Sequence, residues 1–306
     1  MAGLVVLDLG FSALIDRNTS PDYRQTVASK SDFQESKPYD VWIIGDSLAV
    51  DGVAPSVIRQ ETGRTTYDWG LYASSPFEWN ILLRDLEHRS PFPPTVVIVC
   101  HPNMFIKRPN DGPFARAAIK TPGLQFSLMA GSVERADLSA LLASGQRRLM
   151  LKGALAMSAR RSRGEPASAA ESDNGHLVHR TGLNVIPHLM FDALKFDEKN
   201  SKFQADAFED LVRRCSTRGA EVVFAKIAVS EPQLQDYKKD VPTFEHYEQV
   251  LDRVSRQYGA RVYESQTDEV CESYSPSDFT DAIHLSQQGA VKFTTGLARW
   301  LGVRSR

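Results

Sequence analysis

Short apolar runs alternate with amphipathic patterns along most of this 306-residue sequence. Two of these runs, 40–44 (DVWII) and 95–100 (TVVIVC), are almost continuously apolar, which is typical of strands buried on both faces of a parallel sheet. The same criteria predict further strands at 65–67, 221–225 and 261–263, and helices at 55–61, 76–88, 203–218, 245–258 and 286–301. This order predicts an α/β fold of three layers, in which helices cover both faces of a parallel sheet.

The segment from about 105 to 196 breaks this alternation. It contains a PNDGP turn signal, a basic helical stretch near 138–164 and the polar stretch EPASAAESDNGH. We expect the polar stretch to form a loop or lid, and the basic helix either to pack on the sheet edge or to serve as a lid or membrane-surface helix. The chain from 39 to 306 is therefore interpreted as one domain with a largely helical insertion.

Residues 1–38 form a separate N-terminal segment. Its apolar run at 2–15 contains Asp8 and is 14 residues long, whereas a spanning helix needs about 20 residues. Three interpretations stay open at this point: a helix packed on the core, the remnant of a membrane anchor, or a short interfacial helix. The last two would bring the protein to a membrane surface.

Composition argues against several classes of protein. The formal net charge is −2, so nothing favours a nucleic-acid partner. The three cysteines, Cys100, Cys215 and Cys271, are far apart and never form a CxxC pair, so we expect buried thiols. A metal site would need clustered ligands, and the one close histidine pair, His176 and His179, lies at the end of the polar stretch. We expect neither a metal nor a cofactor.

Gly45, Asp46 and Ser47 directly follow the first predicted strand. Ligands of open α/β sheets bind at the carboxyl ends of strands, and a glycine there permits a tight turn. Ser47 would then open the next helix as a candidate nucleophile. By itself, this tripeptide is also a common turn and helix-capping sequence.

Asp281 and His284 stand near the other end of the chain, in the sequence Asp-Ala-Ile-His. A serine hydroxyl needs a base, usually histidine, and a third group, commonly aspartate, that holds the imidazole in one tautomer. An aspartate three residues before the histidine can fold back to reach Nδ1. The alternative is a helix-capping aspartate next to a surface histidine.

Two further residues follow predicted strands and can donate hydrogen bonds to an oxyanion. Gly70 can present its backbone N–H close to a substrate because it has no Cβ, and Asn103 can donate its side-chain amide. The alternatives are an ordinary strand-end turn and a loop Asx-turn. Because three of the four features follow strand ends directly and the fourth opens the last helix, separate loops can assemble one site.

In this order, the four blocks resemble those of the SGNH, or GDSL, hydrolase superfamily, whose members share a flavodoxin-like fold. The resemblance covers about 40–103 and 220–301. It implies that Ser47 is the nucleophile, His284 the base and Asp281 its orienter, with an oxyanion hole made by the Ser47 N–H, Gly70 and Asn103. The sequence LAVDGVAPSVI after Ser47 resembles membrane-anchored bacterial members, which implies a cell-envelope location, with the cytoplasm as the alternative.

The third block departs from the family pattern Gly-x-Asn-Asp, since this chain has His101, Pro102, Asn103 and Met104 there. We count Asp46 and His101 with the substrate-binding group, although His101 can equally be a packing histidine.

The hypothesis is a serine esterase acting on short-chain acyl esters, including carbohydrate-linked ones. The alternatives are an O-acyltransferase that modifies a cell-envelope glycan with the same triad, and a catalytically silent module that binds a glycan or a protein.

Overall fold

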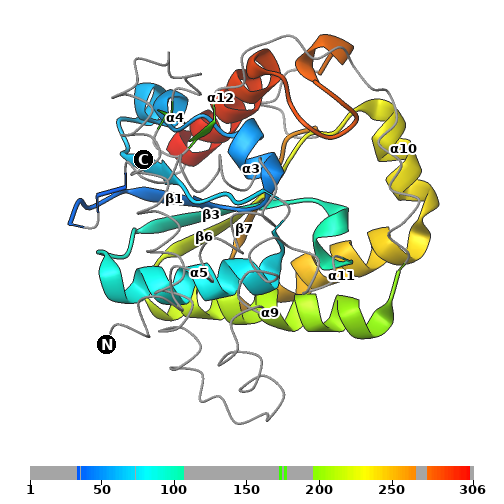
Figure 1. Cartoon of the computed structure of the whole chain (residues 1–306), viewed down its shortest axis with the longest axis horizontal. Coiled ribbons are helices and arrows are strands. Elements are labelled where there is room, and N and C mark those ends of the chain that lie inside the picture. Colours follow the sequence, from blue (N-terminus) through cyan, green and yellow to red (C-terminus); the bar gives the residue numbers. More distant parts are fainter. Residues whose placement is uncertain are drawn as a thin grey trace, which may run out of the picture.

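A five-stranded parallel sheet forms the centre of the structure (Figure 1). The computed structural model describes residues 33–34, 36–72, 74–106, 172–173, 176–177, 196–266 and 274–303. The sheet has the order β2-β1-β3-β6-β7, from strands β1 (Val41–Ile44), β2 (Thr66–Asp68), β3 (Thr95–Cys100), β6 (Glu221–Lys226) and β7 (Arg261–Glu264). Every residue of the central strand β3 is buried, in agreement with its continuous apolar sequence. The predicted α/β fold with a parallel sheet is confirmed.

Helices cover both faces of this sheet (Figure 1). One face carries α3 (Ser47–Gly52), α4 (Pro55–Thr62) and α12 (Gln287–Val303), and the other carries α5 (Pro76–Arg89), α9 (Glu198–Thr217) and α11 (Val241–Tyr258). Successive side chains of a strand point to opposite faces, and β1 follows this rule. Trp42 and Ile44 belong to the core beside α5, α9 and α11, whereas Val41 and Ile43 belong to the core beside α3, α4 and α12.

The α10 helix (Glu231–Lys239) was not predicted; it follows β6 and lies at the side of the molecule in Figure 1. Its sequence, EPQLQDYKK, has few apolar residues at helical spacing, so the pattern gave no signal. Two other helices begin earlier than predicted. The α9 helix begins at Glu198 because the side chain of Asp197 caps it, and α11 begins at Val241.

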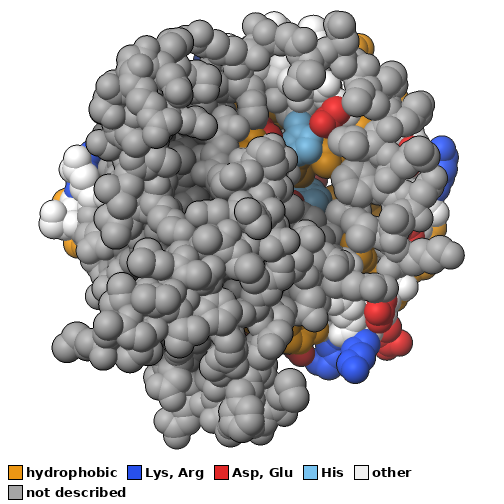
Figure 2. Space-filling model, in the orientation of Figure 1, with side chains coloured by type: hydrophobic (Ala, Val, Ile, Leu, Met, Phe, Trp, Pro, Cys, Tyr) orange, Lys and Arg blue, Asp and Glu red, His pale blue; other side chains and the backbone are white. Residues whose placement is uncertain are grey.

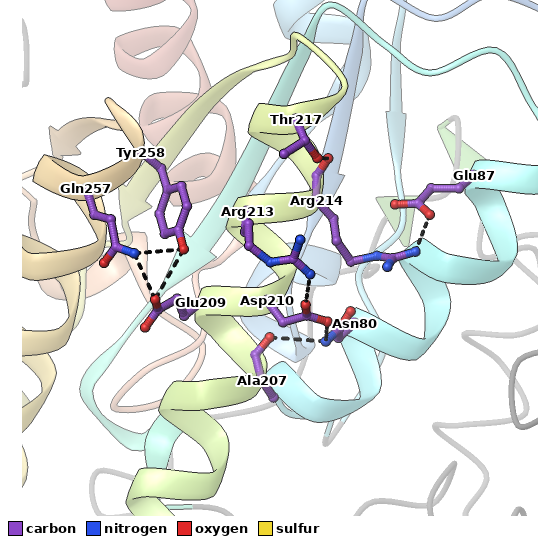
Figure 3. A network of polar contacts seen from close by, with 10 residues as sticks. All are labelled: Asn80, Glu87, Ala207, Glu209, Asp210, Arg213, Arg214, Thr217, Gln257 and Tyr258. Atoms are coloured by element: carbon purple, nitrogen blue, oxygen red, sulfur yellow. Dashed lines mark hydrogen bonds and ion pairs between the residues drawn. The ribbon is translucent and has the colours of Figure 1, made fainter. Parts of the chain in front are cut away.

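Polar side chains join α5, α9 and α11 (Figure 3). Asn80 of α5 donates a hydrogen bond to Asp210 of α9 at 2.7 Å. From α11, Gln257 and Tyr258 donate to Glu209 of α9 at 3.1 and 3.2 Å. We call this group the helix network; its members are Asn80, Glu87, Glu209, Asp210, Arg213, Arg214, Arg253, Gln257 and Tyr258.

Inside the predicted insertion, the structure describes a short antiparallel hairpin, β4 (Ser172–Asp173) and β5 (His176–Leu177). The hairpin includes the end of the polar stretch that was expected to form a loop or lid, and pairing of the two strands replaces a loop there. The β5 strand lies beside α3, the helix that begins at Ser47. The basic helix and the polar loop otherwise fall outside the described residues, as do the apolar run at 2–15 and Cys271, so the domain boundaries stay a prediction.

Two absences hold for the described residues alone. No helix among them is long and apolar enough to cross a membrane. Within the same ranges, no cluster of histidine, cysteine and acidic side chains is suited to hold a metal ion. Cys100 and Cys215 are buried free thiols, as predicted.

Candidate active site

Three loops that leave the carboxyl ends of neighbouring strands lie at one edge of the sheet. The β1 strand leads into 45–47, β2 into 69–71, and β3 into the short helix η2 (Pro102–Phe105). Backbone hydrogen bonds join the first two loops: the Trp69 N–H donates to the Ile43 carbonyl at 2.7 Å, and the Leu71 N–H donates to the Gly45 carbonyl at 3.0 Å. The predicted residues Ser47, Gly70 and Asn103 therefore come to the same edge, as the parallel topology requires.

The turn before Ser47 is closed by its own aspartate. Asp46 Oδ1 accepts the Leu48 N–H at 3.0 Å, so Asp46 caps α3 and Ser47 becomes its first residue. The helix sits close to both strand ends: a Cβ on Gly45 would lie 2.7 Å from the Ala49 Cβ, and one on Gly70 would lie 2.9 Å from the same atom. Glycine at these two positions lets α3 approach the sheet closely enough to fix Ser47 at its edge.

The loop that carries Asp281 and His284 is held by its own backbone. Asp281 Oδ1 accepts the N–H groups of Ile283 and His284 at 2.9 and 2.8 Å, and the Thr280 N–H donates to the His284 carbonyl at 2.9 Å. The aspartate therefore folds back over three residues. Its other oxygen, Oδ2, lies 2.7 Å from His284 Nδ1, which is the contact that the spacing of the two residues predicted.

Ser47 and His284 are 237 residues apart in sequence, and their side chains meet: His284 Nε2 lies 2.9 Å from Ser47 Oγ. An ionised carboxylate can only accept, so Nδ1 carries the hydrogen that is shared with Asp281. In the neutral imidazole, Nε2 is then the acceptor, and the Ser47 hydroxyl donates to it. The three side chains form one chain of hydrogen bonds from carboxylate to hydroxyl.

Competing effects set the pKa values of Asp281 and His284. Burial raises the pKa of Asp281, but the hydrogen bond and charge of His284 and the two backbone N–H donors bring it below its ordinary value. For His284, burial lowers the pKa, whereas the hydrogen bond and charge of Asp281, followed by the charges of Asp51 and Asp46, raise it above the ordinary value overall. The carboxylate is therefore ionised near neutral pH, and the imidazole titrates above its usual range.

The side chains of Asp281 and His284 are each 20% exposed, and Ser47 is half-buried. In the space-filling view, histidine side chains reach the surface next to acidic and hydrophobic ones (Figure 2).

Two of the predicted oxyanion donors form hydrogen bonds with acceptors in the protein. The Gly70 N–H donates to Asp68 Oδ1 at 2.6 Å, so in this conformation it does not face a substrate as a free donor. Asn103 Nδ2 donates to the Tyr237 hydroxyl at 3.1 Å, which leaves the second hydrogen of this primary amide for another acceptor. In the described part of the chain, no acceptor faces the N–H of Ser47. This N–H and the Asn103 amide are the donors still available to a bound oxygen.

Asp46 and His101 bind each other. His101 Nε2 lies 2.8 Å from Asp46 Oδ2, and their side chains are 3% and 2% exposed. The pair ties the loop after β3 to the turn before Ser47, so the structure gives both residues a role in holding the site together. A contact of either side chain with substrate stays a prediction.

Sequence reasoning missed two residues that contact the predicted site. Asp68 is the last residue of β2 and accepts the hydrogen bond from the Gly70 N–H. The available signal was its position two residues before a glycine that follows a strand. Tyr237 comes from α10, the helix without a sequence signal, so nothing in the pattern pointed to it.

Several solved structures are similar to this chain, among them the following two. A protein of the G-D-S-L family from Desulfitobacterium hafniense is 10% identical, with a TM-score of 0.42 over 87% of this chain and 99% of that one. A GDSL-like lipase from Bacteroides thetaiotaomicron is 7% identical, with a TM-score of 0.44 over 93% of this chain and 98% of that one. No protein-family model and no curated protein matches the sequence. Both matches concern the overall fold.

Proposed function

We propose that the protein is a serine hydrolase that cleaves acyl esters through an acyl-enzyme. Ser47 is the nucleophile, His284 the general base and acid, and Asp281 the group that orients and stabilises the imidazole. The hydrogen-bond chain from Asp281 through His284 to Ser47, at 2.7 and 2.9 Å, is the observation that supports this function. This chain of hydrogen bonds ends on the Ser47 hydroxyl, and a serine hydroxyl does not ionise by itself near neutral pH. A hydrogen bond from the hydroxyl to a histidine base is the arrangement that activates a serine.

Acylation follows from the direction of these hydrogen bonds. As Ser47 Oγ attacks the ester carbonyl carbon, its proton passes to His284 Nε2, and the carbonyl oxygen becomes an oxyanion. When the tetrahedral intermediate collapses, the bond between the carbonyl carbon and the alcohol oxygen breaks. His284 Nε2 gives its proton to that oxygen, so the alcohol leaves neutral and the acyl group stays on Ser47. The charge of Asp281 stabilises the imidazolium between these two proton transfers.

Deacylation repeats the sequence with water. Water attacks the acyl carbon and gives a proton to His284 Nε2, and collapse of the second tetrahedral intermediate breaks the bond to Ser47 Oγ. The proton returns to Ser47, and the carboxylic acid is released. In both halves, we assign stabilisation of the oxyanion to the Ser47 N–H and the Asn103 amide, since the Gly70 N–H is engaged by Asp68.

The substrate class that we propose is a short-chain acyl ester, including esters carried on carbohydrate. This part of the proposal rests on the resemblance of the four sequence blocks that contain Ser47, Gly70, Asn103 and His284.

A fluorophosphonate probe tests the nucleophile directly, because it reacts with activated serines. Wild type should be labelled at Ser47, and Ser47→Ala should lose the label together with ester turnover, by about 10⁴-fold or more. Ser277→Ala is the matched control, since Ser277 is an exposed serine close to the loop that carries Asp281 and His284. Mass spectrometry of the labelled peptide and hydrolysis of p-nitrophenyl acetate provide the readouts.

If Ser47→Ala were labelled and turned over substrate like wild type, the proposed function would be wrong. Labelling at Ser47 without release of acid in water would instead favour transfer to a hydroxyl acceptor, which added monosaccharides would reveal.

A further inference from the structure

The α10 helix touches the predicted site at two points. At its start, the Ser230 N–H donates to the carbonyl of Ala282, which lies between Asp281 and His284. In its second turn, Tyr237 receives the hydrogen bond from Asn103 Nδ2 at 3.1 Å. One helix therefore joins the loop of His284 to the loop of Asn103, although these loops are far apart in the sequence.

Tyr237 holds the only contact that orients the Asn103 amide within the described residues. The Asn103 backbone carbonyl accepts the Ile106 N–H at 3.3 Å, which holds the backbone of η2 but makes no hydrogen bond to the side-chain amide. In the described part of the chain, the side-chain amide has one hydrogen-bond partner, the Tyr237 hydroxyl. Because that hydroxyl accepts from Nδ2, it fixes the plane of the amide and with it the direction of the second Nδ2 hydrogen.

The buried environment of Tyr237 keeps its hydroxyl in place and uncharged. The side chain is 5% exposed and belongs to the same buried cluster as Leu48 and Ala282. Burial, followed by the negative charges of Asp46 and Asp281, raises the pKa of Tyr237, so the phenol stays neutral wherever a serine hydrolase is active. The hydroxyl therefore acts as a fixed, uncharged anchor.

We infer that Tyr237 is a positioning residue for the oxyanion: its hydroxyl holds the Asn103 amide in the orientation that stabilises the tetrahedral intermediate. The inference rests on the proposed function and adds to it a residue outside the four sequence blocks. Since Tyr237 acts through Asn103, its removal should affect the transition state rather than the binding of substrate.

Tyr237→Phe removes the hydroxyl and keeps the buried ring. We expect kcat to fall about 3- to 10-fold, the range of one net hydrogen bond, while KM changes less than about twofold. The decisive measurement is a double-mutant cycle with Asn103→Ala: in that background, Tyr237→Phe should have no further effect. Rates of fluorophosphonate labelling provide a second readout that needs no known substrate.

Tyr258→Phe is the control, since it removes another tyrosine hydroxyl, one that donates to Glu209 in the helix network, and should leave kcat unchanged. Turnover is calculated per probe-labelled site, so a loss of folded protein does not imitate a loss of rate.

Independent, additive losses for Tyr237→Phe and Asn103→Ala would overturn the inference, and so would a wild-type kcat for Tyr237→Phe. Either result leaves the proposed function in place as long as Ser47→Ala is inactive. An active Ser47→Ala variant would overturn the proposed function and the inference with it.

Discussion

The carboxylates of the helix network and of the Ser47–His284–Asp281 chain are alike in side-chain exposure, but the two groups differ in chemistry. Asp210 and Glu209 have side chains 20% and 25% exposed, and Asp281 and His284 are each 20% exposed. Both groups join side chains from elements that are distant in sequence. The exposure of a carboxylate and its pairing with a charged group therefore do not distinguish the candidate site from a structural network.

The difference lies in what each carboxylate is paired with. The hydrogen bond from Arg253 is the main reason why the pKa of Glu209 lies below its ordinary value. A pair of carboxylate and guanidinium contains no group that exchanges a proton near neutral pH. Asp281 is paired with an imidazole that gains and loses a proton in that range, and the imidazole in turn contacts a hydroxyl. A polar network becomes a candidate for catalysis when it contains a group that can move a proton and ends on a nucleophile.

Asp281→Asn should show the largest effect in this comparison. The amide keeps the size of the side chain but stabilises neither the reactive tautomer nor the imidazolium, so we expect kcat to fall about 10⁴-fold. Ester hydrolysis by the purified variant measures this loss. A decrease of only a few-fold would place Asp281 with the structural carboxylates of the helix network.

The same variant carries a prediction for pH dependence. Only neutral His284 can accept the Ser47 proton, so kcat/KM should rise with pH through the pKa of His284, which in wild type lies above its ordinary value. Asp281→Asn removes the main contribution that raises this pKa and keeps the burial that lowers it. The acid limb should therefore move to lower pH in a profile from about pH 5 to about pH 9.

Asn103→Ala should show an intermediate effect. Loss of one oxyanion donor costs about 10²- to 10³-fold in kcat, so the variant should be impaired but measurable. Asn80→Ala is the matched control, because the Asn80 amide also donates to a side-chain oxygen but does so in the helix network. Equal kcat values for the two variants would show that Asn103 has no special role in turnover.

Glu209→Gln should show the smallest effect on activity, with kcat within about twofold of wild type. Its effect should appear in stability instead: partly exposed ion pairs contribute about 0.2–1 kcal/mol to the free energy of unfolding. The pKa of Glu209 is lowered in the folded state, so this contribution is present above its ordinary pKa and is lost as the pH falls through the folded value. Urea denaturation at neutral and acidic pH measures the difference, and a tenfold loss of kcat would contradict the separation of the two regions.

The sequence predicted those features whose signal is local. The continuous apolar run at 95–100 predicted the central strand β3, and the run at 40–44 predicted β1. The spacing of Asp281 and His284 predicted a contact that closes within three residues. In each case, the pattern and the structure that it specifies occupy the same short stretch of chain.

Other features lacked a local signal. The α10 helix has a polar sequence, so neither the helix nor the contact of Tyr237 with Asn103 was predicted. Gly70 is an exception: it was expected as a free donor, but its N–H has an acceptor in Asp68, only two residues earlier in the sequence. The buried pair of Asp46 and His101 joins two loops, and its members are 55 residues apart in sequence, so no spacing within either loop predicts the contact.

The amino-acid sequence by itself determined the alternation of strands and helices, the turn that offers Ser47 and the loop that pairs Asp281 with His284. Hydrophobic periodicity and short-range hydrogen bonds are properties of a few consecutive residues, so they can be read along the chain. Only the tertiary structure decided that Ser47 and His284 meet across 237 residues, and that the Asn103 amide is engaged by Tyr237. The contacts that complete the site depend on where the parallel sheet places the ends of its strands, and that placement results from the packing of the whole core.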